Sequence, residues 1–217
     1  MSKKIAVVLS GCGFLDGAEI NESVLTLLAI EEANCDYQVY APNIDQHHVI
    51  NHFTGEETSE SRNVLVESSR IVRGEISPLE ALEPDQFDAL ILPGGYGVAK
   101  NLSDLASTGK DVSINRSLLD ICLAFCRLKK PAGYICIAPA LLPKIYGEGV
   151  VCTIGNDEET ASIINACGGV HEQTAVEEVI IDAERKVVST PAYMLANNLM
   201  EARTGIKKLV DAVVSMI

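Results

Sequence analysis

The segment GYICIAP, residues 133–139, places a cysteine at the end of a stretch with the length and apolar composition of a buried strand. Pro139 can occupy the first turn of a following helix, because its fixed φ suits that position and its missing N–H is not needed there. Cys136 would then lie just before a helix N-terminus, where the dipole and the free amides favour a thiolate. This pattern is similar to the nucleophile elbow G-x-S-x-G, with cysteine replacing serine, and predicts an exposed, somewhat strained thiol.

The alternative interpretation of Cys136 is a small buried side chain. Free cysteine is among the most buried residue types, and a strand cysteine usually packs as an apolar group. We give this interpretation to five other cysteines, namely Cys35, Cys122, Cys126, Cys152 and Cys167. Whether Cys136 borders a cavity therefore decides between a reactive thiol and a structural one.

A reactive thiol needs a proton partner, and the segment GAEINES offers two carboxyl groups. Glu19 and Glu22 are three residues apart, which places them on one face of a predicted helix. A carboxyl group pressed against a thiolate in a low-dielectric pocket tends to hold its proton and share it, which suits acid/base catalysis. For Glu19 the alternative is an acidic residue that the helix dipole stabilises in the first turn.

The segment LPGGYG, residues 92–97, contains adjacent glycines after another predicted strand. Gly94 and Gly95 allow a sharp turn with N–H groups free to bind an anion. Beside a nucleophile, these amides would form an oxyanion hole. The alternative is a structural βα turn, since glycine is common in such turns.

A nucleotide site is disfavoured. Gly11, Gly13 and Gly17 give only a loosened glycine fingerprint after the first predicted strand. A nucleotide site also requires an acidic residue at the end of the second strand to hold the ribose, whereas Asp36 stands at its start and Pro42 at its end.

The elements that must position these residues alternate along the chain. Apolar runs rich in Val and Ile recur with helix-period segments between them, which predicts a mostly parallel sheet covered on both faces. We expect a single domain, residues 1–217, folded as a three-layer α/β/α sandwich with an antiparallel edge hairpin at 178–190. The predicted strands are 4–10, 37–41, 87–92, 132–137, 150–153, 178–182 and 186–190, and the predicted helices are 20–34, 59–73, 113–129, 139–145, 157–167 and 195–216.

Ligands of open α/β sheets bind beyond the carboxyl ends of the strands. The loops expected at that edge are 10–19, 92–101 and 136–143. The segment 42–61 is too long and irregular for a typical connection, which indicates a functional loop or an insertion.

Charge and cysteine content exclude several classes of partner. The formal net charge of −13 disfavours nucleic acid and anionic membrane surfaces, and the chain lacks an apolar run of the about 20 residues that a membrane span needs. We interpret the N-terminal segment as a first strand rather than a signal peptide. Seven cysteines without a C-x-x-C pair indicate reduced thiols, so we expect a cytoplasmic protein.

The segments ILPGGYGVAKNLSD, GYICIAPALLP and DGAEINE together resemble the PfpI and class I glutamine-amidotransferase-like superfamily. The chain resembles the ElbB family, the enhancing-lycopene-biosynthesis proteins, more closely and along nearly its whole length. The segment 42–75 looks like the insertion of that family. The segments that carry the closer resemblance are SGCGFLDGAEINESVLTLLAI, VINHFTGE, RNVLVESSRIVRGEI, LPKIYG and STPAYMLANN.

The resemblance implies a flavodoxin-like fold, commonly dimeric, so we expect a homodimer. It implies that Cys136 is the nucleophile, that Glu22 hydrogen-bonds it, and that the backbone of Gly94, Gly95 and Ile137 binds an oxyanion. Other residues that the resemblance and the loops above place near the pocket or the dimer contact are Glu19, Lys100, Asn101, His52, Arg62 and Asn63.

The chain also departs from the superfamily. Peptidases of the superfamily carry histidine directly after the cysteine, where this chain has Ile137, and glutamine amidotransferases need a later His–Glu pair that this sequence does not reveal. His171 follows Cys136 by 35 residues, and whether it takes part in catalysis stays open. Protease and amidotransferase activities are therefore disfavoured.

Proteins resembling ElbB have been assigned a cofactor-independent glyoxalase activity that converts glyoxal to glycolate, so the resemblance implies a small dicarbonyl substrate and an association with isoprenoid biosynthesis. Cys136 would add to one aldehyde, and Glu22 would move a proton between the two carbons of the hemithioacetal. We expect no metal and no other cofactor, since no Cys/His set has zinc spacing. The alternative is a redox-responsive or regulatory protein whose thiol is oxidised, with only incidental aldehyde turnover.

Overall fold

The computed structural model describes residues 2–217, and within them seven strands form one central sheet. In order across the sheet these are β10 (Ile180–Asp182), β11 (Val187–Thr190), β7 (Ala132–Ile135), β6 (Ala89–Leu92), β1 (Lys4–Val8), β2 (Asp36–Ala41) and β5 (Ile76–Pro78). Neighbouring strands are parallel except β10 and β11, which form the predicted edge hairpin. The chain builds outward in both directions from β1 and β6, so a topological switch point lies between these two strands.

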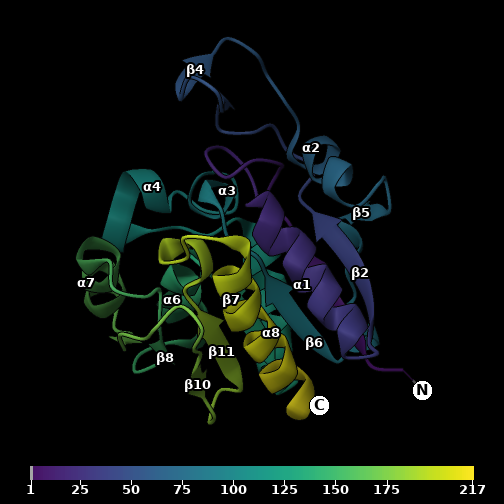
Figure 1. Cartoon of the computed structure of the whole chain (residues 1–217), viewed down its shortest axis with the longest axis vertical. Helices are drawn as coiled ribbons and strands as arrows, with labels where there is room; N and C mark the ends of the chain where they lie inside the picture. Colours follow the sequence, from purple (N-terminus) through teal and green to yellow (C-terminus); the bar gives the residue numbers. More distant parts are fainter. Residues whose placement is uncertain (1) are drawn as a thin grey trace.

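Helices cover both faces of this sheet (Figure 1), which confirms the predicted three-layer sandwich. Successive residues of β1 face opposite sides: Ile5 and Val7 belong to the core under one helix layer, and Ala6 and Val8 to the core under the other. The helices are α1 (Ile20–Glu32), α2 (Val64–Ile71), α3 (Tyr96–Lys100), α4 (Leu105–Thr108), α5 (Arg116–Arg127), α6 (Leu142–Tyr146), α7 (Glu158–Ala166) and α8 (Leu199–Ser215).

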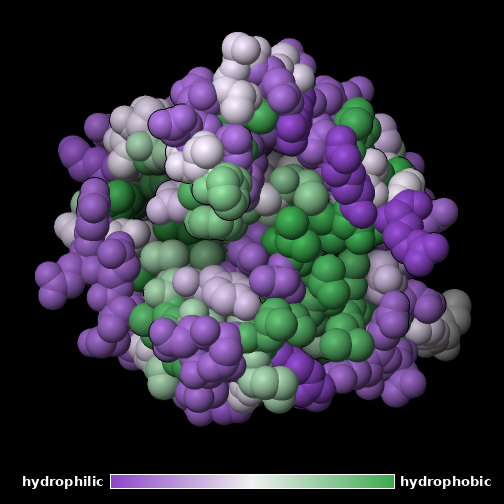
Figure 2. Space-filling view, turned by 45° about the horizontal axis from the view of Figure 1, so that its top comes forward, coloured by the Kyte–Doolittle hydropathy of each residue, from purple (hydrophilic) through white to green (hydrophobic). Residues whose placement is uncertain are grey.

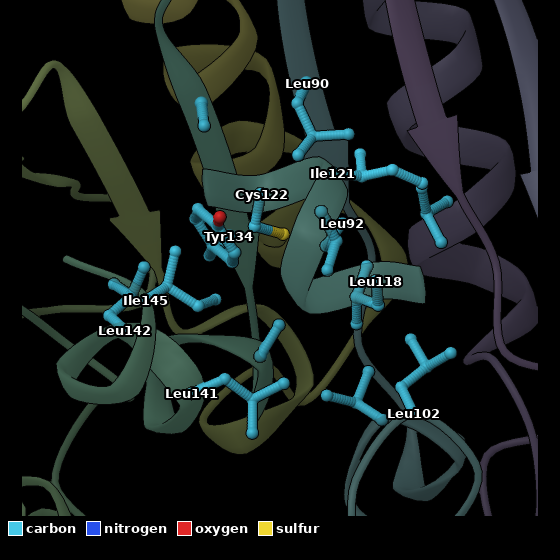
Figure 3. Close-up of a cluster of buried hydrophobic side chains, with 14 of the residues drawn as sticks. Leu90, Leu92, Leu102, Leu118, Ile121, Cys122, Tyr134, Leu141, Leu142 and Ile145 are labelled. Carbon is cyan, nitrogen blue, oxygen red and sulfur yellow. The ribbon is translucent and has the colours of Figure 1, made fainter. Parts of the chain in front are cut away.

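Each face of the sheet has its own continuous apolar core. Helices α1 and α8 supply one of these cores, and α5 and α6 supply much of the other. Figure 3 shows the second core, where Leu92 of β6, Cys122 of α5 and Tyr134 of β7 lie together. Cys122 is fully buried, as expected for a structural cysteine.

Several boundaries differ from the prediction for local reasons. The predicted strand 150–153 is a two-residue strand, β8 (Val151–Cys152), which pairs with β9 (Val170–His171) outside the central sheet, because β10 already covers that edge. Helix α8 begins later than expected, because the Asn198 side chain accepts hydrogen bonds from the first-turn amides.

The segment 42–75 contains the short hairpin of β3 (Val49–Asn51) and β4 (Glu56–Thr58), followed by α2. The hairpin projects from the body of the molecule above α1 in Figure 1. Phe53 at its tip is 98% exposed. Helix α2 begins at Val64 rather than near residue 59, because the side chain of Asn63 accepts the amide of Val66 and caps it.

One face of α1 carries apolar side chains that the chain itself does not cover. Ile20, Val24 and Leu28 are spaced by four residues, so they form one row along the helix, and each is exposed. Apolar side chains gather right of centre in Figure 2, on the side where α1 lies in Figure 1. Across residues 2–217, none of the helices combines the length and apolar character that crossing a membrane requires.

Candidate active site

The buried carboxyl group of Glu22 lies at the centre of the carboxyl edge of the sheet. Glu22 is in the first turn of α1 and is 0% exposed. Its Oε2 accepts the amide of Gly94, 2.9 Å away at the end of β6, and its Oε1 accepts the amide of Tyr193, 3.1 Å away in the loop after β11. One side chain of α1 therefore joins two loops that are distant from it in the sequence.

Cys136 directly follows β7 and has a positive φ of 62°. This conformation is unfavourable for a non-glycine residue and is typical of a nucleophile elbow. The amide of Cys136 donates to Thr190 O at 2.9 Å, which ties the elbow to the end of β11. The thiol lies beside the Glu22 carboxyl and faces the amides of Gly95 and Ile137. The predicted contact between Cys136 and Glu22 is therefore present.

A second strained residue supports the same contact. Ala192 has a φ of 43°. Among the described residues, Cys136 and Ala192 are the buried non-glycine residues with positive φ, whereas the others are in turns that are at least partly exposed. Ala192 directly precedes Tyr193, whose amide donates to Glu22. Backbone strain is thus concentrated at the residues that hold the Glu22 carboxyl and the thiol.

The adjacent glycines after β6 are required for this approach. A Cβ at position 94 would overlap the Cβ of Cys136 and lie 2.7 Å from Glu22 Oε2. Gly95 has a φ of 96°, and a Cβ there would overlap the backbone of the loop that precedes α1. The glycines therefore let three backbone segments meet around one sulfur atom.

The oxyanion prediction needs a correction at Gly94. Its amide is already the hydrogen-bond partner of Glu22, so it is not free to bind an oxyanion. The amides of Gly95 and Ile137 point to the sulfur instead, which leaves them as the candidate donors.

The electrostatics of the pair also differ from the expected thiolate. Burial raises the pKa of the Glu22 carboxyl to about 8, against the opposing effect of the Tyr193 and Gly94 amides. Burial, followed by the charge of Glu22, raises the pKa of the Cys136 thiol. The helical segment after Cys136, Ala138–Leu141, is a short buried 3₁₀ turn, so desolvation outweighs its dipole. Both shifts favour the protonated forms of the thiol and the carboxyl near neutral pH.

Cys136 is 7% exposed, but its side chain lines a cavity of about 510 Å³. This distinguishes it from a cysteine packed wholly in the core, such as Cys122. Glu19 lines the same cavity. Its side chain also caps α1 by accepting the Glu22 amide at 2.6 Å, so Glu19 has the structural role of a helix-capping residue as well. The cavity is lined by Phe14, Glu19, Gly95, Tyr96, Ala99, Leu105, Ala106, Cys136, Ile137, Asp157, Glu159, Thr160, Ile163, Tyr193 and Met194.

Lys100, Asn101 and His52 do not line this cavity, contrary to expectation. Lys100 donates to Leu15 O at 3.0 Å and contacts His48. Asn101 is buried and donates to the carbonyl oxygens of Ser10 and Asp16. The Nε2 atom of His52 accepts the Leu15 amide at 3.3 Å. These side chains hold the loop after β1 rather than the cavity wall.

Arg62, Asn63 and His171 are also outside the cavity lining. Arg62 pairs with Glu60 at 2.7 Å, and Asn63 caps α2. His171 accepts the Ile154 amide at 3.3 Å. These contacts explain the three side chains as structural, because their polar atoms bind elements away from Cys136.

Most residues of the cavity wall carry no distinctive sequence pattern. Phe14 and Tyr96 are in loops that were expected at the site. Neither residue is part of a recognisable sequence motif, so nothing singled them out as wall residues. Tyr193 lies in the segment STPAYMLANN, and its amide rather than its side chain holds Glu22. Asp157, Glu159 and Thr160 come from the start of α7, where acidic residues are also typical helix-capping residues. A backbone donor or a helix terminus leaves no distinctive pattern in a sequence.

The arrangement can form a covalent bond to a carbonyl carbon and move protons beside it. The Cys136 thiol is placed to act as a nucleophile, the pKa of Glu22 is near the physiological range, and the amides of Gly95 and Ile137 face the sulfur. Within the described residues, no group of three or more His, Cys, Asp and Glu side chains is arranged to hold a metal ion.

The chain is similar to three curated mitochondrial proteins. The ES1 protein homolog of Rattus norvegicus is 40% identical over 98% of this chain and 84% of its own length. The glutamine amidotransferase-like class 1 domain-containing protein 3 of Homo sapiens is also 40% identical, over 98% of this chain and 83% of its own. The ES1 protein of Danio rerio is 32% identical over 88% and 76%. No protein-family model matches the chain.

Solved structures show the same fold. An isoprenoid biosynthesis protein with an amidotransferase-like domain from Ehrlichia chaffeensis superposes with a TM-score of 0.93, at 35% identity over 99% of both chains. The glyoxalase III of Candida albicans superposes with a TM-score of 0.65, at 12% identity over 99% of this chain and 97% of its own. At that identity the second comparison concerns the fold alone.

The expected cytoplasmic localisation is wrong by these comparisons, because the three curated relatives are all mitochondrial. Cysteine composition indicates a reducing environment but does not distinguish one reducing compartment from another.

The raised pKa of Glu22 predicts a pH-dependent difference in stability between Glu22→Gln and the unmodified protein. Between the ordinary value of 4.5 and about 8, the native carboxyl is protonated and the unfolded one is ionised, so stability is lost as pH rises. The free energy of unfolding of the variant minus that of the unmodified protein should increase by about 1.4 kcal/mol per pH unit in this window. Denaturant titrations at several pH values measure it.

The glutamine amide cannot accept both backbone N–H groups, so it adds a penalty that does not depend on pH. Only the slope against pH therefore tests the prediction. Glu184→Gln, which removes an exposed carboxyl from the β10–β11 turn, is the control for loss of one carboxyl group. Parallel stability curves for Glu22→Gln and the unmodified protein would show that Glu22 is ionised in the native state at neutral pH.

Proposed function

The chain belongs to the family of the ES1 and ElbB-like isoprenoid biosynthesis proteins, and we propose that it converts glyoxal to glycolate with Cys136 as the nucleophile. The observation that carries the proposal is the contact between the Cys136 thiol and the buried Glu22 carboxyl at the edge of a cavity. In this pair the proton partner of the sulfur is a carboxyl group. A carboxyl group with a pKa of about 8 can act as both base and acid near neutral pH.

The first step is addition of the thiol to an aldehyde. The Cys136 sulfur forms a bond to one carbonyl carbon while its proton passes to ionised Glu22 and from there to the carbonyl oxygen. The product is a hemithioacetal that still carries the second aldehyde. The amides of Gly95 and Ile137, which face the sulfur, are placed to stabilise the oxygen while it is negative.

The second step moves hydrogen between the two carbons. Glu22 removes the proton from the carbon bonded to sulfur, and the electron pair passes to the oxygen of the neighbouring carbonyl, which gives an enediolate. Glu22 then returns the proton to the second carbon, and the hydroxyl proton of the first carbon moves to the second oxygen. The result is a thioester of glycolate, and water hydrolyses it to glycolate and the free thiol.

The proposed sequence needs no oxidant or reductant, since one aldehyde carbon is oxidised and the other is reduced. The fold similarity to a glyoxalase III supports the proposal only as far as the fold. The isoprenoid association is proposed from the name of the Ehrlichia chaffeensis protein. The redox alternative is less well supported, because a thiol that is 7% exposed and has a raised pKa reacts slowly with peroxide.

We predict that the purified protein, treated with a chelator, forms glycolate from glyoxal, and that Cys136→Ala and Glu22→Gln each abolish turnover. The alanine removes the nucleophile, and the glutamine cannot accept a proton. Glycolate is measured by chromatography. Cys12→Ala, which removes a half-buried thiol outside the cavity lining, is the matched control and should keep activity.

Normal turnover by Glu22→Gln would contradict the proton-transfer steps. Absence of turnover in the unmodified protein, with peroxide still adding mass at Cys136, would favour the redox function instead.

We also predict that kcat/KM for glyoxal rises with pH through about 8 and then levels off, because the base form of Glu22 starts the reaction. With that pKa, about one tenth of the carboxyl is ionised at pH 7, so the plateau should be about tenfold higher. Initial rates between pH 6 and pH 9.5, corrected for glyoxal breakdown by hydroxide without protein, give the profile. A profile that falls between pH 7 and pH 9 is inconsistent with Glu22 as the base.

We propose that the protein is a homodimer that pairs through α1. The row of Ile20, Val24 and Leu28 supports this, because an exposed apolar helix face can cover itself across a twofold axis. Light scattering should give a dimer for the unmodified protein and a monomer for Val24→Glu. Leu128→Glu, an exposed apolar position after α5, is the control and should stay dimeric. A Val24→Glu dimer would place the interface elsewhere.

A further inference from the structure

The cavity beside Cys136 is much larger than glyoxal requires. Its volume is about 510 Å³. Glyoxal has four non-hydrogen atoms, and four water molecules of about 30 Å³ each fill roughly a quarter of that space. A substrate that consisted only of the two reacting carbonyl groups would leave most of the cavity wall without contact.

Much of the cavity wall is aromatic and apolar. Phe14 and Tyr96 both line the cavity and are 48% and 49% exposed, and the Tyr96 amide donates to Phe14 O at 2.7 Å, so the two residues are held as neighbours. Aromatic rings half open to solvent at a cavity are available to contact a ligand. The lining also includes the apolar residues Ile137, Ile163 and Met194.

Phe14 is held in place by residues outside the cavity. The Leu15 amide donates to His52 Nε2 at 3.3 Å, and the His52 ring packs edge-on against the Phe14 ring at 5.7 Å. Asn101 donates to Ser10 O and Asp16 O on either side of the same loop. A ring fixed in this way loses little conformational freedom when it packs on a ligand.

The charged groups of the lining are all acidic. Glu19, Asp157 and Glu159 line the cavity, and none of the lining residues in the described part of the chain is lysine, arginine or histidine. Asp157 and Glu159 are exposed at the start of α7. The Lys100 ammonium group lies over the Tyr96 ring, 5.0 Å from its centroid, but Lys100 is not a lining residue. The charged groups of the wall that a negatively charged ligand would meet are therefore carboxylates.

From the aromatic wall, the volume and the sign of the charges, we infer that the site prefers 2-oxoaldehydes with an uncharged aromatic substituent over glyoxal. This inference rests on the proposed function, which supplies the reaction at Cys136. The aldehyde lies against the thiol and the amides of Gly95 and Ile137, and the ring lies between Phe14 and Tyr96. A carboxylate or sulfonate on the ring would face the acidic groups and weaken binding.

The first test compares kcat/KM for phenylglyoxal, 4-carboxyphenylglyoxal and glyoxal. Phenylglyoxal should exceed glyoxal by at least about tenfold, as expected for burial of a ring against apolar surface. Phe14→Ala and Tyr96→Ala should each reduce this ratio, whereas Phe53→Ala, at the exposed hairpin tip, should not. Glu159→Lys should raise kcat/KM for the carboxylated substrate relative to phenylglyoxal. Equal values for glyoxal and phenylglyoxal would overturn the inference and leave the proposed function standing.

The second test does not depend on turnover. Methanethiosulfonates that carry a methyl, a benzyl or an anionic sulfonatoethyl group modify the thiol, and mass spectrometry of the peptide that contains Cys136 gives each rate. After division by the rates for a small thiol in water, the benzyl reagent should be fastest and the sulfonate slowest. Equal corrected rates would overturn the inference. The protein could show the predicted order of rates and yet turn over no 2-oxoaldehyde. That result would contradict the proposed function but support the inferred ligand preference of the cavity.

Discussion

The carboxyl group of Glu22 is the interaction on which the site depends. It is fully buried, and its two oxygens accept amides from the loops after β6 and β11 while it contacts the thiol after β7. An unpaired buried carboxyl is costly, so the loops must keep their positions as long as the fold exists. The positive φ angles of Cys136 and Ala192 are tolerated because the contacts of Glu22 and the hydrogen bonds of the sheet hold both residues in place.

The same contact sets the chemistry. No basic side chain lines the cavity within the described residues, so burial acts on the thiol and the carboxyl without a compensating positive charge. The Cys136 thiol and the Glu22 carboxyl each have to lose a proton before the sulfur can attack or the carboxylate can act as a base. Such a pair is suited to proton transfer at a carbonyl compound, in which the acid and the base are the same group at different moments.

The segment 42–75 acts on the site indirectly. Its His52 binds the loop after β1 and packs against Phe14, yet it does not line the cavity. A projecting hairpin with few contacts of its own can therefore influence a pocket by fixing one aromatic ring of its wall. This is the physical reason why residues that were expected in the pocket are instead found supporting it.

Local patterns in the sequence were enough to predict the layer architecture, the edge hairpin and the cysteine elbow, because periodicity, the glycine pair and Pro139 act over a few residues. The choice of Glu22 over Glu19 as the partner of Cys136 came from the family resemblance. Which amides are free depends on long-range packing, since the Gly94 amide donates to a side chain 72 positions away in the sequence. Long-range packing also raises the pKa of Glu22, because burial is produced by all the layers together. The cavity wall, with Phe14, Tyr96 and α7, depends on the same long-range packing, which no local pattern encodes.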